Sequence, residues 1–237
     1  MNEVKVSICM LNIDRYIIGR YVLEKNLLNC GIPLQDIELL ILDNGSKDKR
    51  AIDYLSGIAN VFIQEQENIG VAKGFNKLLR KAAGQYVCLF DNDIILSDNW
   101  LKDFISFNKR VPKSGISAIH CVLEKGIHIP KYNIYVPDNG TVYSTRFFHR
   151  SLLESIGGFN ENLSTYGYED SELTYRTATA GYINYYLPNQ YSTHYGADFG
   201  AKTEFRKFKD EELKANQSKF FEAIKSVKET GKYKIPL

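Results

Sequence analysis

Short apolar runs alternate with stretches of helical periodicity through the first half of the chain, and this alternation restricts the fold more than any other feature. The apolar runs, each of strand length, are Val4–Met10, Ile37–Leu42, Val61–Gln64 and Tyr86–Phe90. The helical patterns between them cover Tyr16–Leu28, Lys49–Leu55 and Gly70 to Ala83. Alternation of this kind is typical of a parallel sheet with helices on both faces. We therefore predict a doubly wound α/β sheet over about the first 120 residues.

The second half of the chain has a different pattern. A strand is predicted at Ile116–Cys121, and residues 127–149 alternate and turn like antiparallel hairpins. The remaining predicted elements are helices at Arg150–Ile156 and Asp170–Ala180, a strand at Tyr182–Leu187 and a charged helix from Lys202 onward. We predict a single domain over residues 1–237, with a front half at 1–120, a second half at 121–200 and a helical extension at 201–237.

The composition excludes several classes of protein. Of 237 residues, 44% are hydrophobic and 24% are charged, and the formal net charge of +2 gives no reason to expect a nucleic-acid partner. No apolar run approaches the roughly 20 residues that span a bilayer, and the N-terminus lacks a signal-peptide pattern. The four cysteines, Cys9, Cys30, Cys88 and Cys121, fit no metal spacing, so we expect reduced thiols in a cytoplasmic protein.

Two acidic turns follow predicted strands and are candidate ligand-binding positions. Asp43-Asn44-Gly45-Ser46 follows the second strand, and Asp91-Asn92-Asp93 follows the fourth. In sheets of this kind, ligands bind beyond the carboxyl ends of the strands. Carboxylates at i and i+2 can share one Mg²⁺ or Mn²⁺ ion, whose shell is completed by substrate phosphates. A solvated turn has the same residue types, so this pattern alone leaves both interpretations open.

A phosphatase of the haloacid dehalogenase type is an alternative, because its nucleophile also follows an apolar strand as Asp-x-Asp. In that family a Thr or Val usually stands two residues after the second Asp, where this chain has Ile95. The motif also usually lies near the N-terminus, so the sequence disfavours this alternative.

Several motifs occur in a fixed order along the chain. In the first half they are Leu42-Asp43-Asn44-Gly45-Ser46, Asn68-x-Gly70 extending to Asn76, and Asp91-x-Asp93. In the second half they are Ile156-Gly157-Gly158-Phe159, Tyr168-Glu169-Asp170 with Arg176, and His194. Together they resemble the inverting glycosyltransferases of family 2, which have the GT-A fold, and the later motifs also resemble the carboxyl-terminal part of galactosyltransferases. The resemblance implies a nucleotide-binding front half and an acceptor-binding second half.

The resemblance also implies roles for individual residues. Asp43 matches the carboxylate that binds the base of a nucleotide sugar, most simply a UDP-sugar. The other residues that would border the nucleotide sugar are Asn12, Asn68, Gly70, Asp91 and Asn92. Asp93 matches the ligand of Mn²⁺ or Mg²⁺, with Asp91 and His194 as further metal contacts. The chain departs from the family at Met10-Leu11-Asn12, where Thr-Tyr-Asn is usual, so the aromatic platform near the base is missing.

Asp170 matches the catalytic base, and Glu169 matches a neighbouring acceptor-binding or backup carboxylate. In inverting transfer, an acceptor hydroxyl loses a proton as it attacks the anomeric carbon, and a carboxylate is an adequate general base for this step. The dipole at a helix N-terminus favours the ionised form of Asp170. Acidic residues are also common in the first turn of a helix for structural reasons alone, so this pair has a second interpretation.

Three further candidates have structural alternatives. Lys73 could face the diphosphate of the donor or be a solvated helical lysine. Trp100 and Tyr168 are candidate acceptor contacts, and packing against the following helix is the alternative for Trp100. The C-terminal helical segment from Lys202 to Leu237 has ten Lys and Arg against six Asp and Glu. This basic segment could contact an anionic membrane surface, a second copy in a homodimer or its own domain.

The sequence therefore predicts a metal-dependent inverting glycosyltransferase that moves a hexose-type sugar to a glycan, a lipid-linked saccharide or a protein. A nucleotidyltransferase of the sugar-nucleotide pyrophosphorylase type is an alternative. It is disfavoured because Asn12-Ile13-Asp14-Arg15 stands where those enzymes carry a Gly-rich segment with Arg and Lys. A non-catalytic nucleotide-sugar-binding module is the other alternative, although none of the expected carboxylates is missing.

Overall fold

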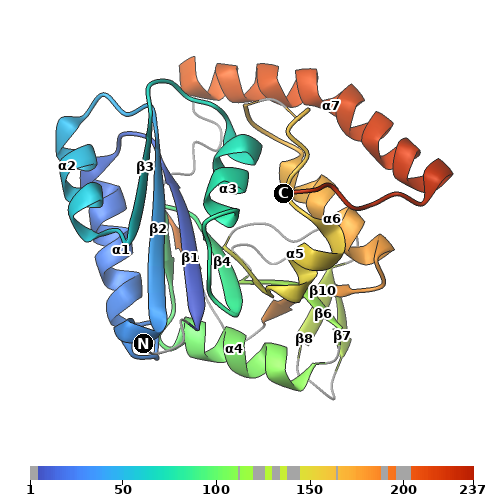
Figure 1. Cartoon of the computed structure of the whole chain (residues 1–237), viewed down its shortest axis with the longest axis horizontal. Helices are drawn as coiled ribbons and strands as arrows, with labels where there is room; N and C mark the ends of the chain where they lie inside the picture. Colours follow the sequence, from blue (N-terminus) through green and yellow to red (C-terminus); the bar gives the residue numbers. More distant parts are fainter. Residues whose placement is uncertain are drawn as a thin grey trace.

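The computed structural model describes residues 5–111, 113–119, 126–129, 134–137, 145–163, 165–187, 192–195 and 204–237. Within these residues, nine strands form one sheet in the order β3-β2-β1-β4-β9-β6-β10-β8-β7. The strands of the first half are β1 (Val6–Asn12), β2 (Ile37–Asn44), β3 (Val61–Glu65) and β4 (Tyr86–Phe90). All four are parallel, as predicted, because each crossover between them contains a helix. Figure 1 shows these strands side by side.

Helices cover both faces of this sheet. In the first half they are α1 (Tyr16–Leu28), the 3-10 helix η1 (Leu34–Asp36), α2 (Lys49–Ile58), α3 (Val71–Leu79) and α4 (Trp100–Arg110). Because strand side chains alternate, Ile8 and Met10 pack with α1 and α4 on one face, whereas Cys9 packs with α3 on the other. The prediction extended α3 to Ala83, but the helix ends earlier, where the Ala82 carbonyl accepts a hydrogen bond from Arg150.

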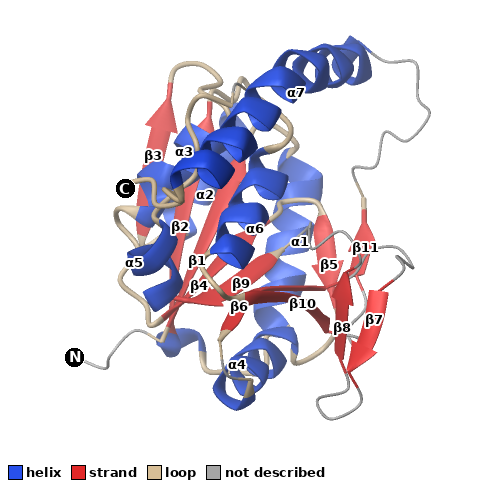
Figure 2. Ribbon diagram, turned by 90° about the vertical axis from the view of Figure 1, so that its right-hand side faces the viewer, coloured by secondary structure: helices blue, strands red, loops and turns tan. Residues whose placement is uncertain are grey.

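The second half continues the same sheet. Its strands are β6 (Ser114–Ile119), β7 (Gly126–Ile129), β8 (Ile134–Pro137), β9 (Arg146–His149) and β10 (Ile183–Leu187). The predicted hairpin exists as the antiparallel pair β7 and β8, and most of the intervening turns lie outside the described residues. The sequence did not predict that β9 inserts between β4 and β6, antiparallel to both. Two three-residue strands, β5 (Ile94–Leu96) and β11 (Ser192–His194), pair as a separate sheet (Figure 2).

The helices of the second half are α5 (Ser151–Ile156), α6 (Glu169–Thr179) and α7 (Glu204–Thr230). Helix α7 crosses the top of the molecule in Figure 1, and the chain after it returns to the domain. There the Gly158 amide donates to the Ile235 carbonyl at 3.0 Å, and the Ile235 amide donates to the Ile156 carbonyl at 3.0 Å. Among the described residues, no helix is long and apolar enough to cross a membrane.

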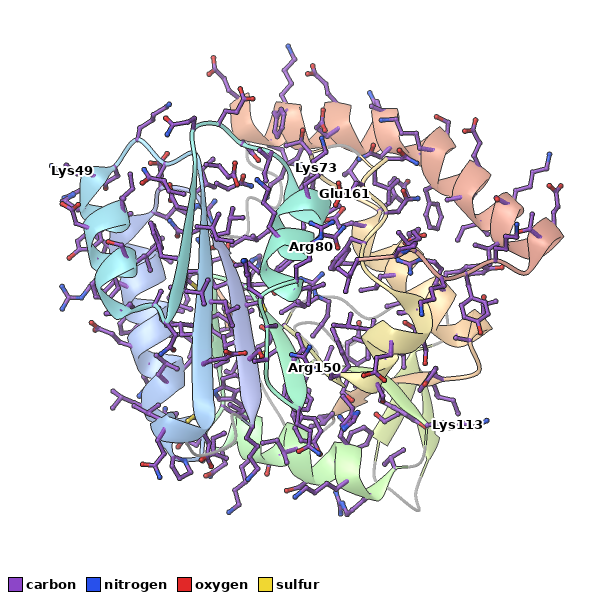
Figure 3. All side chains as sticks on the ribbon, in the orientation of Figure 1. Lys49, Lys73, Arg80, Lys113, Arg150 and Glu161 are labelled. Atoms are coloured by element: carbon purple, nitrogen blue, oxygen red, sulfur yellow. The ribbon has the colours of Figure 1, made fainter. Side chains whose placement is uncertain are left out.

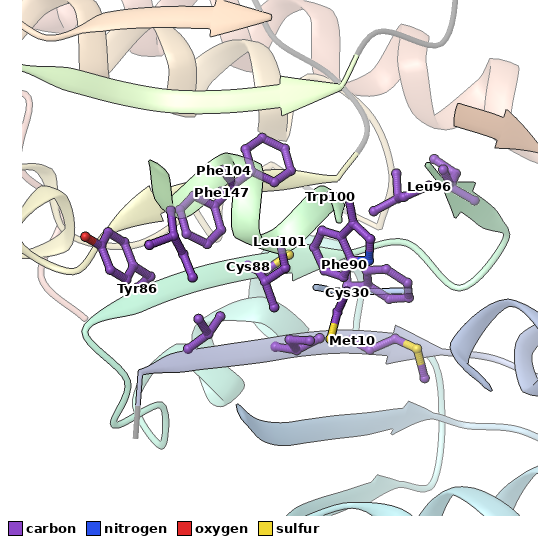
Figure 4. Packing of buried hydrophobic residues seen from close by; sticks show 14 of the residues in the cluster. Met10, Cys30, Tyr86, Cys88, Phe90, Leu96, Trp100, Leu101, Phe104 and Phe147 are labelled. Atoms are coloured by element: carbon purple, nitrogen blue, oxygen red, sulfur yellow. The ribbon is translucent and has the colours of Figure 1, made fainter. Parts of the chain in front are cut away.

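Aromatic and thiol side chains fill the core on the α4 face of the sheet (Figure 4). Trp100 is fully buried there between Phe90 and Phe104. Cys9, Cys30 and Cys88 are buried free thiols, as predicted, and Cys121 lies outside the described residues. Burial raises the pKa of the Cys88 thiol, so this thiol stays protonated and behaves as a small apolar side chain.

Candidate functional site

Polar side chains meet at the carboxyl-terminal edge of the parallel strands. Asn12 ends β1 and is the register partner of Asp43 on β2. The Nδ2 atom of Asn12 lies 3.5 Å from Asp43 Oδ1. The Oδ1 atom of Asn12 accepts a hydrogen bond of 2.9 Å from Asn92, which follows β4. Three neighbouring strands therefore place predicted nucleotide-site residues in one hydrogen-bonded row.

Asp43 lies inside a tight turn. Its side chain is fully buried, its Oδ2 accepts the Ser46 amide at 3.1 Å, and its Oδ1 accepts the Ser46 hydroxyl. Gly45 has a φ of +87°, and a Cβ there would lie 2.7 Å from the backbone of Glu67, so the turn requires glycine. The contact of Asp43 with a nucleotide base stays a prediction.

The loop that contains Asn68 and Gly70 is fastened to the end of β2. Asn44 donates to Asn68 Oδ1 at 2.9 Å and accepts the Ile69 amide at 2.9 Å. The same Asn68 oxygen accepts the Gly70 amide at 2.9 Å, which turns the chain into α3. Lys73 is exposed on that helix (Figure 3). Its contact with the diphosphate of a donor stays a prediction, and a solvated lysine stays the alternative.

The small sheet brings a histidine to the acidic motif. His194 pairs with Ile94 in β5, and its Nε2 atom lies 3.2 Å from Asp93 Oδ1. Asp93 Oδ2 accepts a hydrogen bond of 2.9 Å from Arg15. Burial alone would raise the pKa of Asp93, but the hydrogen bond from His194 and the charges of His194, Arg15 and Lys209 lower it overall. The bond to Asp93 in turn raises the pKa of His194.

Asp91 differs from Asp93 in its surroundings. Its Oδ2 atom is buried and has no hydrogen-bond partner in the described part of the chain. Burial raises the pKa of Asp91, and the guanidinium of Arg146 partly opposes this effect. An unpartnered buried carboxylate oxygen is costly, so it marks a position where a cation or a hydroxyl group would be stabilised.

Arg146 is the site residue that the sequence analysis missed. It begins β9, its side chain is 3% exposed, and its Nη2 atom lies 3.7 Å from Asp91 Oδ1. Its Nη1 atom forms an ion pair with Asp170 Oδ1. One guanidinium group therefore contacts an early acid and a late acid. The available signal was a charged residue inside the apolar strand pattern Arg146-Phe147-Phe148.

Glu169 and Asp170 begin α6 next to these groups. The chain enters the helix through Gly167 and Tyr168, both with positive φ, at +97° and +68°. Glu169 is 8% exposed, and burial raises its pKa, although its own amide, Arg146 and the Gly167 amide act in the opposite direction. The predicted catalytic pair thus lies at the same site as the acidic motif after β4.

Helix α7 holds the loop that precedes this pair. Asn216 is fully buried and donates to the carbonyls of Tyr166 at 3.0 Å and Gly167 at 3.2 Å. Glu212 accepts the Thr165 amide at 2.9 Å. The ring of Tyr168 stacks on Phe220 with centroids 4.9 Å apart. Of the three alternatives for the basic C-terminal segment, the structure shows contact with its own domain.

Trp100 is not part of the site. Its side chain is fully buried, and its Nε1 donates to the Asn26 carbonyl at 3.0 Å. The prediction of an acceptor contact is corrected on this point, because a side chain closed in by Phe90 and Phe104 cannot contact a ligand. Tyr168 is partly buried and directed at α7, and its contact with an acceptor stays a prediction.

Among the described residues, the protein supplies only part of a metal-binding set. The described ranges contain no group of three or more His, Cys, Asp and Glu side chains that could hold a metal ion alone. Mg²⁺ and Mn²⁺ are commonly bound by one or two carboxylates together with substrate phosphates. Asp93 and the partnerless oxygen of Asp91 supply the two carboxylates of such a set, and His194 is bonded to Asp93 beside them.

Comparison with known families agrees with this geometry. Residues 22–119 match the family model described as Glycosyl transferase family 2. These residues are similar to a family 2 glycosyltransferase domain. Residues 126–197 match a second model, described as the N-terminal domain of galactosyltransferase. The sequence motifs had indicated a resemblance to the carboxyl-terminal part of galactosyltransferases instead. Both matched models are glycosyltransferase domains, and no curated protein matches the sequence.

Solved structures show that the stretch matched by the family 2 model and the second half together have the GT-A fold. TarS 1-349 of S. aureus in complex with UDP-GlcNAc is 19% identical, with a TM-score of 0.62 over 84% of this chain and 61% of that chain. The mannosyltransferase PcManGT of Pyrobaculum calidifontis, in complex with GDP-Man and Mn²⁺, is 19% identical, with a TM-score of 0.62 over 83% and 58%. GalNAc-T7 with UDP, GalNAc and Mn²⁺ is 12% identical, with a TM-score of 0.66 over 81% and 44%. The chain thus spans less than two thirds of each of these three proteins.

Proposed function

We propose that this protein is a metal-dependent, inverting glycosyltransferase that uses a nucleotide-sugar donor, UDP-linked in the first instance. The observation that carries the proposal is the contact of Arg146 with both Asp91 and Asp170. These two acids belong to motifs 79 positions apart by their numbering, yet they lie within reach of one guanidinium group. Donor-side and acceptor-side chemistry can therefore take place at one location.

The donor would bind at the carboxyl-terminal edge of β1, β2 and β4. Asp43 and the loop of Asn68 and Gly70 border this edge, and Asn12 and Asn92 link its strands. TarS, PcManGT and GalNAc-T7 were solved with UDP-GlcNAc, GDP-Man and UDP respectively, which supports a nucleoside diphosphate at this edge. GDP-sugars therefore belong among the donors to be tested.

Asp93 would hold Mn²⁺ or Mg²⁺ together with Asp91 and His194. Such an ion neutralises the negative charge that develops on a leaving nucleoside diphosphate. The charges of His194, Arg15 and Lys209 all lower the pKa of Asp93. Asp93 is consequently ionised, as a metal ligand must be, well below neutral pH.

Asp170 would accept the proton of the attacking hydroxyl. Its carboxylate lies in the first turn of α6, where the helix dipole and the ion pair with Arg146 both stabilise the charged form. Glu169 lies beside it, and its raised pKa suits a group that donates hydrogen bonds to acceptor oxygens when protonated. The acceptor hydroxyl would belong to a glycan, a lipid-linked saccharide or a protein. Contact with a membrane or with a second copy is compatible with the exposed face of α7.

The test is sugar transfer from a panel of UDP- and GDP-sugars with Mn²⁺, with product release followed by mass spectrometry. Asp93→Ala and Asp170→Asn should each abolish most of the turnover, whereas Asp53→Ala on the exposed face of α2 should not change it. Wild-type turnover in both site variants overturns the proposal. Proton NMR of the product anomer distinguishes inversion from retention.

Two other outcomes identify the alternatives. Binding of a UDP-sugar in calorimetry, with no transfer to any acceptor and no donor hydrolysis, would indicate a binding module. Formation of a sugar nucleotide from a nucleoside triphosphate and a sugar 1-phosphate would indicate a nucleotidyltransferase. Either result rejects the proposed reaction.

A further inference from the structure

Arg146 is a buried cation on β9, a strand that lies between β4 and β6 inside the sheet. It is the register partner of Leu89 on β4 and of Ala118 on β6, so its side chain lies on the α3 face with theirs. Asp91 follows Leu89 by two residues, and side chains two apart in an extended chain share a face. The insertion of β9 between β4 and β6 therefore delivers this guanidinium to the acidic edge.

The guanidinium packs on an aromatic ring and also contacts two acids. Its Cζ atom lies 5.3 Å from the centre of the Phe75 ring, a cation–π arrangement that fixes the plane of the group. Its Nη2 atom approaches Asp91, and its Nη1 atom pairs with Asp170. The Nε atom is buried with no hydrogen-bond partner among the residues that the structure describes.

A second buried arginine shows what a purely structural role is like in this chain. Arg176 is 1% exposed and pairs with Glu172 through Nε at 2.7 Å and Nη2 at 2.9 Å. It also donates to the carbonyls of Ile156 at 2.7 Å and Gly158 at 2.6 Å, so it braces backbone segments. Arg146, in contrast, is placed between two carboxylates that the proposed reaction uses.

We propose that Arg146 is a positioning residue: it orients the carboxylate of Asp170 and keeps it directed toward the donor-side acid Asp91. The inference rests on the proposed function, because orientation of the base matters only if Asp170 takes the proton of an acceptor. Arginine suits the task because its planar, always charged fork contacts two carboxylates at once, which the point charge of lysine does less well. Arg146 acts through Asp170, so it should contribute to turnover and contribute little to donor binding.

The experiment is a double-mutant cycle on Arg146 and Asp170. In the wild-type background, Arg146→Met should lower kcat by about 100-fold, the lower range for a general base, with the donor KM changed by less than about twofold. In the Asp170→Asn background, the same change should lower kcat by less than about threefold, because a residue that acts through the base has nothing left to orient. Arg146→Lys should retain part of the activity, and guanidinium ion should restore part of the kcat of Arg146→Ala.

A matched control separates positioning from folding. Arg150→Met removes another arginine (labelled in Figure 3), which donates to the Gly84 carbonyl at 2.7 Å and to the Ala82 carbonyl and not to the site acids. This variant should lower the Tm without a comparable loss of kcat. If Arg146→Met does not fold, the cycle is run with Arg146→Lys, which keeps the buried charge.

The outcomes distinguish the inference from the function on which it rests. If the wild-type protein is active and the kcat losses of the two single variants multiply in the double variant, the role of Arg146 is overturned. The proposed transferase function is then unaffected. A raised donor KM at unchanged kcat also overturns this role, because it would place Arg146 in donor binding. Wild-type protein that transfers no sugar overturns the proposed function and this role together.

Discussion

Asn76 on α3 is hydrogen-bonded in both directions to Phe159: its Nδ2 donates to the Phe159 carbonyl at 3.0 Å and its Oδ1 accepts the Phe159 amide at 2.8 Å. The two residues belong to different motifs, one within the stretch that matches the family 2 model and one within the Gly-Gly-Phe segment. Asn76 also donates to Glu161 at 2.8 Å. This asparagine therefore joins the two halves of the domain, and its role in the motif is structural.

Asn76→Ala should lower the free energy of unfolding by about 2–3 kcal/mol, because it leaves the buried amide and carbonyl of Phe159 without partners. Urea unfolding followed by circular dichroism measures the change. Lys81→Ala, an exposed residue just after the same helix, is the control and should stay within about 0.5 kcal/mol of wild type. An equal effect of the two changes would contradict the structural role of Asn76.

Two glycines provide a matched pair for steric effects. A Cβ on Gly158 would lie 2.4 Å from Asn76 Oδ1 and 2.6 Å from Leu237, whereas one on Gly57 within α2 would meet nothing within 4 Å. Gly158→Ala should therefore destabilise the protein by about 1–3 kcal/mol. Gly57→Ala should stabilise it by about 0.5–1 kcal/mol, because alanine is the better helix former. Thermal unfolding of both variants checks the sign of each effect.

Asn216→Leu should lower the rate of sugar transfer and leave nucleotide binding almost unchanged. The change removes the bonds to the carbonyls of Tyr166 and Gly167, so the loop before Glu169 loses its support on α7. We expect kcat to fall by about tenfold or more, as for other misplacements of a catalytic group, and the Kd for UDP in calorimetry to change by less than about twofold. Ser218→Leu adds the same side chain on the exposed face of α7 and should leave both values unchanged. A large loss of UDP affinity in Asn216→Leu would contradict this division.

Metal and nucleotide should stabilise the protein together. Ligands that bind only the folded state add about 2.7 kcal/mol at 100 times their Kd, so UDP with Mn²⁺ should raise the Tm of the wild-type protein. Asp93→Asn should remove most of this increase, and Asp53→Asn should retain it. A full increase in Asp93→Asn, measured by differential scanning fluorimetry, would show that the nucleotide binds without this carboxylate.

Local patterns predicted the regular elements well. The bounds of α1 and β4 agree with the prediction, because β4 is a short apolar run that is buried throughout and α1 is a longer segment with apolar residues at helical spacing. Local patterns also placed the acidic turns after β2 and β4 at the carboxyl ends of their strands, and the structure links Asp43 and Asn92 there through Asn12. That inference was available because parallel strands end at one edge of the sheet.

Local sequence patterns could not predict the pairing of strands that lie far apart in the sequence. The strands β5 and β11 have three residues each and pair across a wide interval of sequence, so neither has a periodicity of its own. The insertion of β9 into a mostly parallel sheet also depends on partners remote in sequence. Arg146 was missed for that reason, since its chemistry comes from acids contributed by other elements. The acceptor contact of Trp100 was predicted wrongly because the sequence distance from Asp93 does not determine the direction of the Trp100 side chain.

The C-terminal segment is tied to both ends of the stretch from Gly157 to Tyr168. Ile235 pairs with Gly157, and Asn216 and Phe220 contact the loop that ends at Tyr168. A polypeptide cut before Glu204 would keep the strand-end acids in the sheet while leaving the entry to α6 unsupported on its outer side. The two proposed capacities of the protein, retaining a nucleotide and delivering a sugar, would then be separable by one truncation. Residues 204–237, added as a synthetic peptide, would be the reagent to reunite them.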